Sequence, residues 1–95
     1  MILAIDYDAT WSADPELWEA FAQMVQQRGH QLVLVTNRAD TKINRDEVGP
    51  VVGPHVEWLL FAGPTPKKDY AEAHGIRPQI WIDDNPQTVH LGLTL

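Results

Sequence analysis

The sequence contains no cysteine and comparatively few basic residues. Without cysteine, disulfides and thiolate metal ligands are excluded, and redox chemistry does not define the compartment. Seven lysine and arginine residues face thirteen acids, which gives a net charge of -6 at pH 7. A broad nucleic-acid-binding surface depends on cationic contacts to phosphates, so this balance argues against one. Several acids gathered in one place would instead favour a divalent cation.

Long hydrophobic runs are also missing. No stretch approaches the ~18 apolar residues of a membrane span. The short apolar run at residues 2–5 lacks a basic lead and is followed by acids. We therefore expect neither a membrane anchor nor a signal peptide, and the cytoplasm is the expected compartment. With 95 residues and a hydrophobic fraction of 44%, the chain predicts one small domain over residues 1–95.

Four short apolar runs predict buried strands of a parallel sheet. They are residues 2–5, 31–36, 56–61 and 79–82. Asp14 and Pro15 predict the start of a helix that ends near Arg28. Its predicted inward face consists of Leu17, Trp18, Phe21, Met24 and Val25. Thr65 predicts the cap of a further helix over 66–74.

The remaining segments are less regular. Residues 38–48 predict a short helix, because Gly-Pro pairs at 49–50 and 53–54 are expected to break regular structure. The tail from 88 to 95 alternates polar and apolar residues, which predicts a half-exposed strand at a sheet edge. Strands that alternate with helices indicate right-handed crossovers. The predicted fold class is therefore α/β, a three-layer α/β/α sandwich with a parallel, Rossmann-like sheet of four to five strands.

Polar and charged residues follow the predicted strands at the points where each strand ends. They are Asp6 and Asp8 after the first strand, Thr36, Asn37 and Arg38 after the second, Asp83 and Asp84 after the fourth, and Lys67 and Lys68 at the helix before it. Ligands of open parallel sheets bind beyond the carboxyl ends of the strands, so these residues predict one site. Each also has a structural explanation, since turn acids, β-branched strand ends and solvated lysines are common. The four histidines are scattered and show no metal-ligand spacing.

The order of these residues resembles the motifs of the haloacid dehalogenase-like superfamily of phosphohydrolases and phosphotransferases. The first motif of that family, Asp-x-Asp-x-Thr after a hydrophobic strand, is matched by residues 6–10. Its Ser or Thr at a strand end is matched by Thr36, and its helix lysine by Lys67 or Lys68. Its closing acid pair is matched by residues 83–84, so the resemblance spans residue 1 to about residue 86.

The resemblance implies Mg²⁺-dependent hydrolysis of phosphomonoesters through an aspartyl-phosphate intermediate. Asp6 would be the nucleophile and Asp8 the general acid and base, while Thr36 and Lys67 would hold the phosphoryl oxygens. The implied Mg²⁺ ligands are Asp6, Asp8 through its backbone carbonyl, Asp83 and Asp84. Further residues are expected on the substrate side, with the Trp11 ring stacking on a substrate: Thr10, Trp11, Asn37, Arg38 and Lys68.

Helix geometry favours Lys67 over Lys68 as the phosphate ligand. The apolar residues Tyr70 and Ala71 predict the inward side of this helix, and Lys67 lies three and four positions before them. Lys68 lies about 160° from Tyr70 around the helix axis, which predicts an outward side chain.

The chain departs from this family in having no room for a cap domain. Only residues 11–13 separate Thr10 from the predicted helix cap, and residues 37–55 are too few for a folded insertion. An open site suits a large substrate, such as a phosphorylated macromolecule end, or a site closed by an oligomeric partner. Two alternatives stay open. One is a degenerate module that binds Mg²⁺ or phosphate without turnover, and the other is a receiver-like phosphoacceptor domain, in which the lysine would come last.

Overall fold

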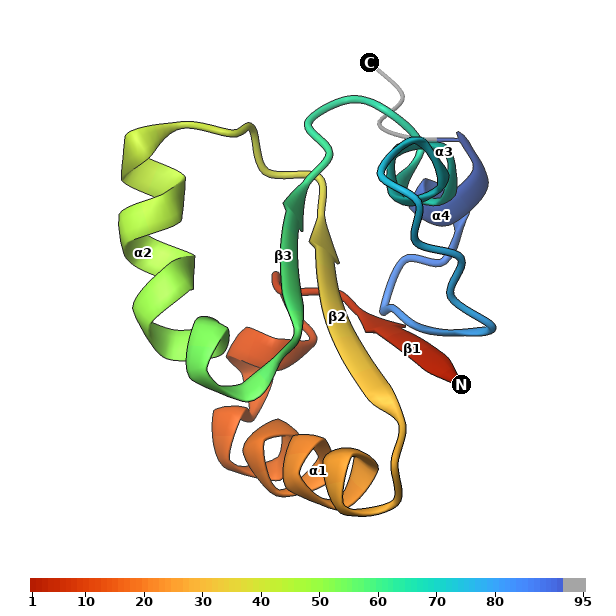
Figure 1. Ribbon diagram of the computed structural model, residues 1–95. Coiled ribbons are helices and arrows are strands. Elements are labelled where there is room, and N and C mark those ends of the chain that lie inside the picture. Colours follow the sequence, from red (N-terminus) through yellow and green to blue (C-terminus); the bar gives the residue numbers. More distant parts are fainter. Residues whose placement is uncertain (92–95) are drawn as a thin grey trace.

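The computed structural model describes residues 1–91, which form an α/β fold on one four-stranded sheet (Figure 1). The strands are β1 (Ile2–Ile5), β2 (Gln31–Thr36), β3 (Trp58–Phe61) and β4 (Ile80–Ile82). All neighbouring pairs are parallel, and the order across the sheet is β3-β2-β1-β4. The predicted α/β class and parallel sheet are therefore confirmed.

Helices cover both faces of the sheet. They are α1 (Pro15–Gln27), α2 (Lys42–Val52), α3 (Lys67–Ala73) and α4 (Gln87–Leu91), with 3₁₀ turns at Trp11–Ala13 and Gly53–His55. Successive strand residues point to opposite faces, so each face has its own core. Leu32 and Leu34 pack with residues of α1 and α2, whereas Val33 and Val35 pack with Ala71 of α3. Figure 1 accordingly shows α2 and α3 on opposite sides of β2 and β3. Among residues 1–91, no helix has both the length and the apolar composition of a membrane span.

The first helix begins at the predicted cap, but its buried face is narrower than predicted. The Asp14 carboxylate accepts the Leu17 N–H at 3.3 Å. The predicted inward residues Leu17 and Met24 are instead exposed, by 53% and 54%. Ala22 and Val25 are buried and join the core. The predicted stripe is therefore too wide, because it includes side chains on both flanks of the line where α1 meets the sheet.

The predicted break at Gly49 and Pro50 is wrong, because α2 continues through both residues to Val52. Val48 and Val52 are four positions apart, share one face of the helix and are fully buried in the core. Pro50 lies on the exposed side of the last turns. Its cost to the helix is one missing N–H donor and crowding of the preceding turn, and burial of the valine pair outweighs that cost.

The predicted edge strand in the tail is also wrong, because α4 takes its place. Thr88 and Val89 are both buried, and adjacent buried side chains do not fit the alternation of a strand. The Thr88 N–H donates to the Asn85 carbonyl and the Val89 N–H to the Pro86 carbonyl, both at 3.1 Å. The Asn-Pro pair therefore opens a helix. The rest of that predicted strand, residues 92–95, lies outside the described residues.

We expect Pro50→Ala to stabilise the protein by about 1 kcal/mol or more, because alanine restores the missing N–H and removes the crowding by the ring. Pro50 is exposed, so no cavity forms. Urea unfolding measures the difference. Pro54→Ala is the matched control, since Pro54 stands in the first turn of a 3₁₀ segment, where proline fits. Its replacement should leave stability unchanged or slightly lower. Equal effects at the two positions would contradict this account of α2.

Candidate active site

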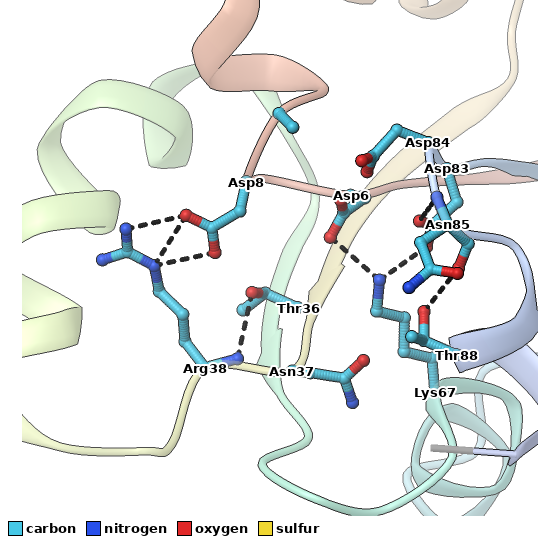
Figure 2. Close-up of a pocket in the computed structure, with 11 residues that line it drawn as sticks. Asp6, Asp8, Thr36, Asn37, Arg38, Lys67, Asp83, Asp84, Asn85 and Thr88 are labelled. Atoms are coloured by element: carbon cyan, nitrogen blue, oxygen red, sulfur yellow. Dashed lines mark hydrogen bonds and ion pairs between the residues drawn. The ribbon is translucent and has the colours of Figure 1, made fainter. Parts of the chain in front are cut away.

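The sheet topology brings the ends of β1 and β4 together. The chain runs from β1 through β2 to β3 and then returns to put β4 on the other side of β1. Such a reversal creates a crevice at the carboxyl ends of the strands, where open α/β sheets bind ligands. A pocket of about 340 Å³ lies there (Figure 2). Its lining residues are Asp6, Asp8, Ala9, Thr36, Asn37, Arg38, Lys67, Asp83, Asp84, Asn85 and Thr88.

A buried lysine lies among the acids of this pocket. Lys67 Nζ donates to Asp6 Oδ1 at 2.8 Å and to Asp83 Oδ2 at 2.5 Å. Only 3% of the Lys67 side chain is exposed, so its ammonium depends on these two carboxylates in place of water. Lys67 is also the first residue of α3, and Pro66 rather than the predicted Thr65 occupies the cap position.

Burial raises the pKa of Asp6. Loss of hydration moves this pKa from 3.8 to about 6, although the hydrogen bond and the charge of Lys67 act in the opposite direction. The neighbouring Asp83 and Asp84 add smaller upward contributions. Asp6 is therefore mainly ionised at neutral pH but poorly hydrated. A carboxyl group perturbed in this way inside a pocket is typical of functional sites.

Three carboxylates converge closely enough to share a cation. Asp6, Asp83 and Asp84 each contribute one oxygen, and these oxygens lie within 4.8 Å of one another. With the ammonium of Lys67, the group carries two net negative charges, which a divalent cation would neutralise. Carboxylate oxygens with added waters are the ligands that Mg²⁺ prefers. The donor set therefore fits the predicted ion.

Thr10, a buried residue outside the pocket lining, connects Asp6 and Asp84. Its hydroxyl accepts the Asp84 N–H at 3.3 Å and lies 3.2 Å from Asp84 Oδ1 and 3.4 Å from Asp6 Oδ2, so its one proton serves one carboxylate at a time. Trp18 Nε1 donates to the Thr10 carbonyl at 2.9 Å. Thr10 is buried and is not among the lining residues. The prediction that it contacts substrate is therefore corrected, since it ties the two acidic loops together.

The end of β2 contributes Thr36 and Asn37 to the pocket. Thr36 Oγ1 accepts the Arg38 N–H at 3.1 Å, which leaves its own hydroxyl proton for another acceptor. Asn37 Nδ2 donates to the carbonyls of Gly63 and Thr65, at 2.8 and 3.1 Å. The side chain of Asn37 thus fastens the β2 end to the loop that precedes α3.

Asp8 lies with Arg38 rather than with the other acids (Figure 2). Arg38 Nη2 donates to Asp8 Oδ1 at 2.8 Å and Nε to Asp8 Oδ2 at 3.0 Å, which makes the pair bidentate. The hydrogen bonds that Arg38 donates to Asp8, and next in size the one to Glu47, raise the pKa of Arg38 above its usual value. The Asp8 carboxylate is not one of the three converging acids, so only its backbone carbonyl is left for the predicted metal role. Arg38 lines the pocket, as a predicted substrate contact would, but its guanidinium is held by Asp8, Glu47 and Asn44.

Two other predicted substrate contacts lie outside the pocket. Trp11 is fully buried in the hydrophobic core, so its ring has no free face for a substrate. Lys68 is exposed, and its Nζ lies 4.0 Å from Glu72 one helical turn away. The predicted helix phase is thus confirmed, since Lys67 faces the pocket and Lys68 does not.

Three lining residues are absent from the sequence-based prediction, namely Ala9, Asn85 and Thr88. A strand in the tail, as predicted, would not direct Thr88 toward this pocket. Because the segment is the helix α4, Thr88 lines the pocket, and its hydroxyl donates to the Asn85 carbonyl at 2.8 Å. The Asn85 N–H in turn donates to Asp83 Oδ1 at 2.9 Å. Ala9 has a φ of 61°, which is uncommon for a residue other than glycine and turns the chain sharply after Asp8.

The chain matches no family model, and it has no significant match among curated proteins or solved structures. The resemblance to the haloacid dehalogenase-like superfamily therefore depends on the order of its motif residues. The geometry of the pocket is an independent observation beside it.

In the metal-free protein, ionisation of Asp6 should lower the free energy of unfolding as the pH rises. The folded state holds the Asp6 proton up to a pKa of about 6, whereas the unfolded chain releases it near 3.8. Between these values the folded state binds more protons, so the free energy of unfolding decreases with pH. Two pKa units correspond to about 3 kcal/mol at most. Asp6→Asn should therefore gain stability relative to wild type, by up to this amount, between about pH 4 and pH 7.

Urea unfolding in EDTA across this pH range measures the difference. Asp40→Asn is the control, because Arg45 lowers the pKa of the exposed Asp40 carboxyl, so that it titrates below this range. Its difference from wild type should stay constant from about pH 5 to pH 7. A difference that is equally constant for Asp6→Asn would contradict the raised pKa.

Proposed function

We propose that this protein is a Mg²⁺-dependent phosphohydrolase that cleaves phosphomonoesters through an aspartyl-phosphate on Asp6. The fold would then be the three-layer sandwich of the haloacid dehalogenase-like superfamily without a cap. The observation that carries the proposal is the buried Lys67 ammonium between Asp6 and Asp83, at the switch point of the sheet. Its support is chemical, because one pocket is lined by a carboxylate suited to act as nucleophile, further carboxylates suited to hold a cation, and hydroxyl and ammonium donors suited to bind phosphate.

In the first step, a carboxylate oxygen of Asp6 would attack phosphorus in line with the leaving oxygen. A bond forms between Asp6 and phosphorus as the bond to the leaving oxygen breaks, and Asp8 gives that oxygen a proton. The hydroxyl of Thr36 and the ammonium of Lys67 would donate to the phosphoryl oxygens. A Mg²⁺ held by Asp6, Asp83 and Asp84 would neutralise the charge between phosphate and carboxylates.

In the second step, water would attack the acyl phosphate and give its proton to Asp8. The bond between Asp6 and phosphorus breaks, and its electron pair returns to the Asp6 carboxylate. The products are an alcohol and inorganic phosphate, and both acids are again in their starting states.

The surroundings of the pocket support a large phosphate ester as substrate. Within residues 1–91, no folded insertion separates β1 from α1 or β2 from α2. The Asp8 side chain is 55% exposed, so the pocket opens to solvent on that side. A phosphorylated macromolecule end would fit such a mouth, as would a site completed by an oligomeric partner. The cytoplasm remains the predicted location.

One observation favours a second candidate, the degenerate module that binds Mg²⁺ or phosphate without turnover. The basic groups of the pocket already have acidic partners: Lys67 is bound by Asp6 and Asp83, and Arg38 by Asp8. Turnover distinguishes the two candidates, because both require the same binding groups.

We expect Mg²⁺-dependent release of phosphate from at least one of three substrate classes: an aryl phosphate, a nucleotide or a phosphorylated nucleic-acid end. Asp6→Asn should lower turnover by about 1,000-fold or more, because an amide cannot replace the nucleophile. Lys67→Ala should lower turnover by about 100-fold, through loss of charge stabilisation. Lys68→Ala, at the adjacent exposed position, is the matched control and should retain wild-type turnover. Full activity in Asp6→Asn would disprove the nucleophile assignment, and Mg²⁺ binding without any turnover would favour the degenerate module.

Magnesium affinity should depend on Asp84, which contributes to the acid cluster without contacting Lys67. Asp84→Asn should weaken Mg²⁺ binding by about tenfold or more in calorimetry, since one charged oxygen ligand is lost. Asp69→Asn removes an exposed acid from α3 outside the pocket and should leave the affinity unchanged. Equal affinities in wild type and Asp84→Asn would exclude a metal site at this location.

A further inference from the structure

The guanidinium of Arg38 connects the pocket with α2. Nε and Nη2 hold the two Asp8 oxygens at 3.0 and 2.8 Å. Nη1 donates to Glu47 Oε2 at 2.6 Å and to Asn44 Oδ1 at 3.3 Å. The guanidinium carbon also lies 5.0 Å from the centroid of the Tyr7 ring. With 22% of its side chain exposed, Arg38 is held on several sides.

These contacts occupy all three guanidinium nitrogens. Asn44 and Glu47 are three positions apart on α2, so they share one face of that helix, and both accept hydrogen bonds from Arg38. Protein groups accept four of the five guanidinium N–H groups, so a substrate phosphate could reach the second N–H of Nη2 but would have to displace a protein acceptor to form a bidentate contact. The arrangement therefore suits an arginine that orients Asp8 better than one that binds substrate.

We propose that Arg38 is a positioning residue for Asp8, supported by Glu47 and Asn44, and that it acts in the hydrolysis of the aspartyl-phosphate. This inference rests on the proposed function. In that step the water oxygen bonds to phosphorus, the electron pair of the breaking bond returns to Asp6, and the water proton passes to Asp8. A carboxylate that accepts one N–H on each oxygen has a fixed plane and keeps lone pairs for that proton. When Asp8 instead gives its proton to the leaving oxygen in the first step, hydrogen bonds from Arg38 to both Asp8 oxygens do not help that transfer.

The test separates the two chemical steps with p-nitrophenyl phosphate, whose leaving group needs little protonation. In Arg38→Gln, formation of the aspartyl-phosphate should persist while its hydrolysis slows by about 100-fold. Rapid mixing should then show a burst of nitrophenolate close to one equivalent of enzyme, larger than in wild type, followed by slow turnover. Both kcat and KM should fall, because the intermediate accumulates.

Two milder variants extend the test and protect it against misfolding. Arg38→Lys keeps the charge but cannot form the bidentate pair, so it should also show the burst. Glu47→Gln loosens the support from α2 and should give a smaller burst with a smaller fall in kcat. Thermal unfolding checks that each variant is folded, and these two variants decide the question where Arg38→Gln does not fold.

Arg45→Gln is the matched control. Arg45 forms the same kind of bidentate pair with Asp40, but neither residue lines the pocket. The substitution should therefore leave burst size, kcat and KM at wild-type values.

Two results would overturn the inference alone: wild-type turnover with no enlarged burst in Arg38→Gln and Arg38→Lys, or a raised KM with unchanged kcat, which indicates direct phosphate binding. Absence of turnover in the wild type would overturn the proposed function and this inference together. The two failures are thus distinguished by the wild-type measurement.

Discussion

The Lys67 ammonium is the group on which the rest of the pocket depends. It joins the segment after β1, through Asp6, to the segment after β4, through Asp83. The side chains of Asp6 and Asp83 are also enclosed, with 8% and 3% exposed. Two buried carboxylates without a counter-charge would cost several kcal/mol, so the meeting of β1 and β4 requires a cation between them. The cation is Lys67, the first residue of α3, and α3 packs on the face of the sheet opposite to α1 and α2.

The Arg38 guanidinium, a second positive group beside Lys67, gives the acids of the pocket two different environments. Asp6 and Asp8 are two positions apart, yet Asp6 is buried beside Lys67 while Asp8 lies in the open beside Arg38. After Asp8, the sharp turn at Ala9 brings the buried Thr10 back against Asp6 and Asp84. Separate environments are what paired carboxyl groups need in order to perform different roles. Under the proposed function, the desolvated acid would attack phosphorus and the open acid would exchange protons with water.

Much of this site could be predicted from the sequence, because a parallel sheet collects the carboxyl ends of its strands even where strand limits are off by a residue or two. The choice of Lys67 needed only the 100° step of a helix. The errors arose where long-range packing outweighed a local signal. Gly49 and Pro50 predict a break, but burial of Val48 and Val52 keeps α2 intact. Asn44 and Glu47 lie within the predicted helix over residues 38–48, but the hydrogen bonds that they accept from Arg38 depend on how the β2 end meets α2, which no local sequence pattern reports.

The support from α2 also bears on how so small a domain could work without a cap. A cap excludes water and orders the groups around a substrate, and neither effect is available at a pocket whose Asp8 is half exposed. A free carboxylate at such a position would sample many rotamers, and each productive encounter would require it to be ordered again. Hydrogen bonds to both Asp8 oxygens restrict that motion while the pocket stays open. Under the proposed function, the network from Glu47 through Arg38 to Asp8 would supply one part of what a cap provides, the ordering, and would leave room for a substrate larger than the pocket.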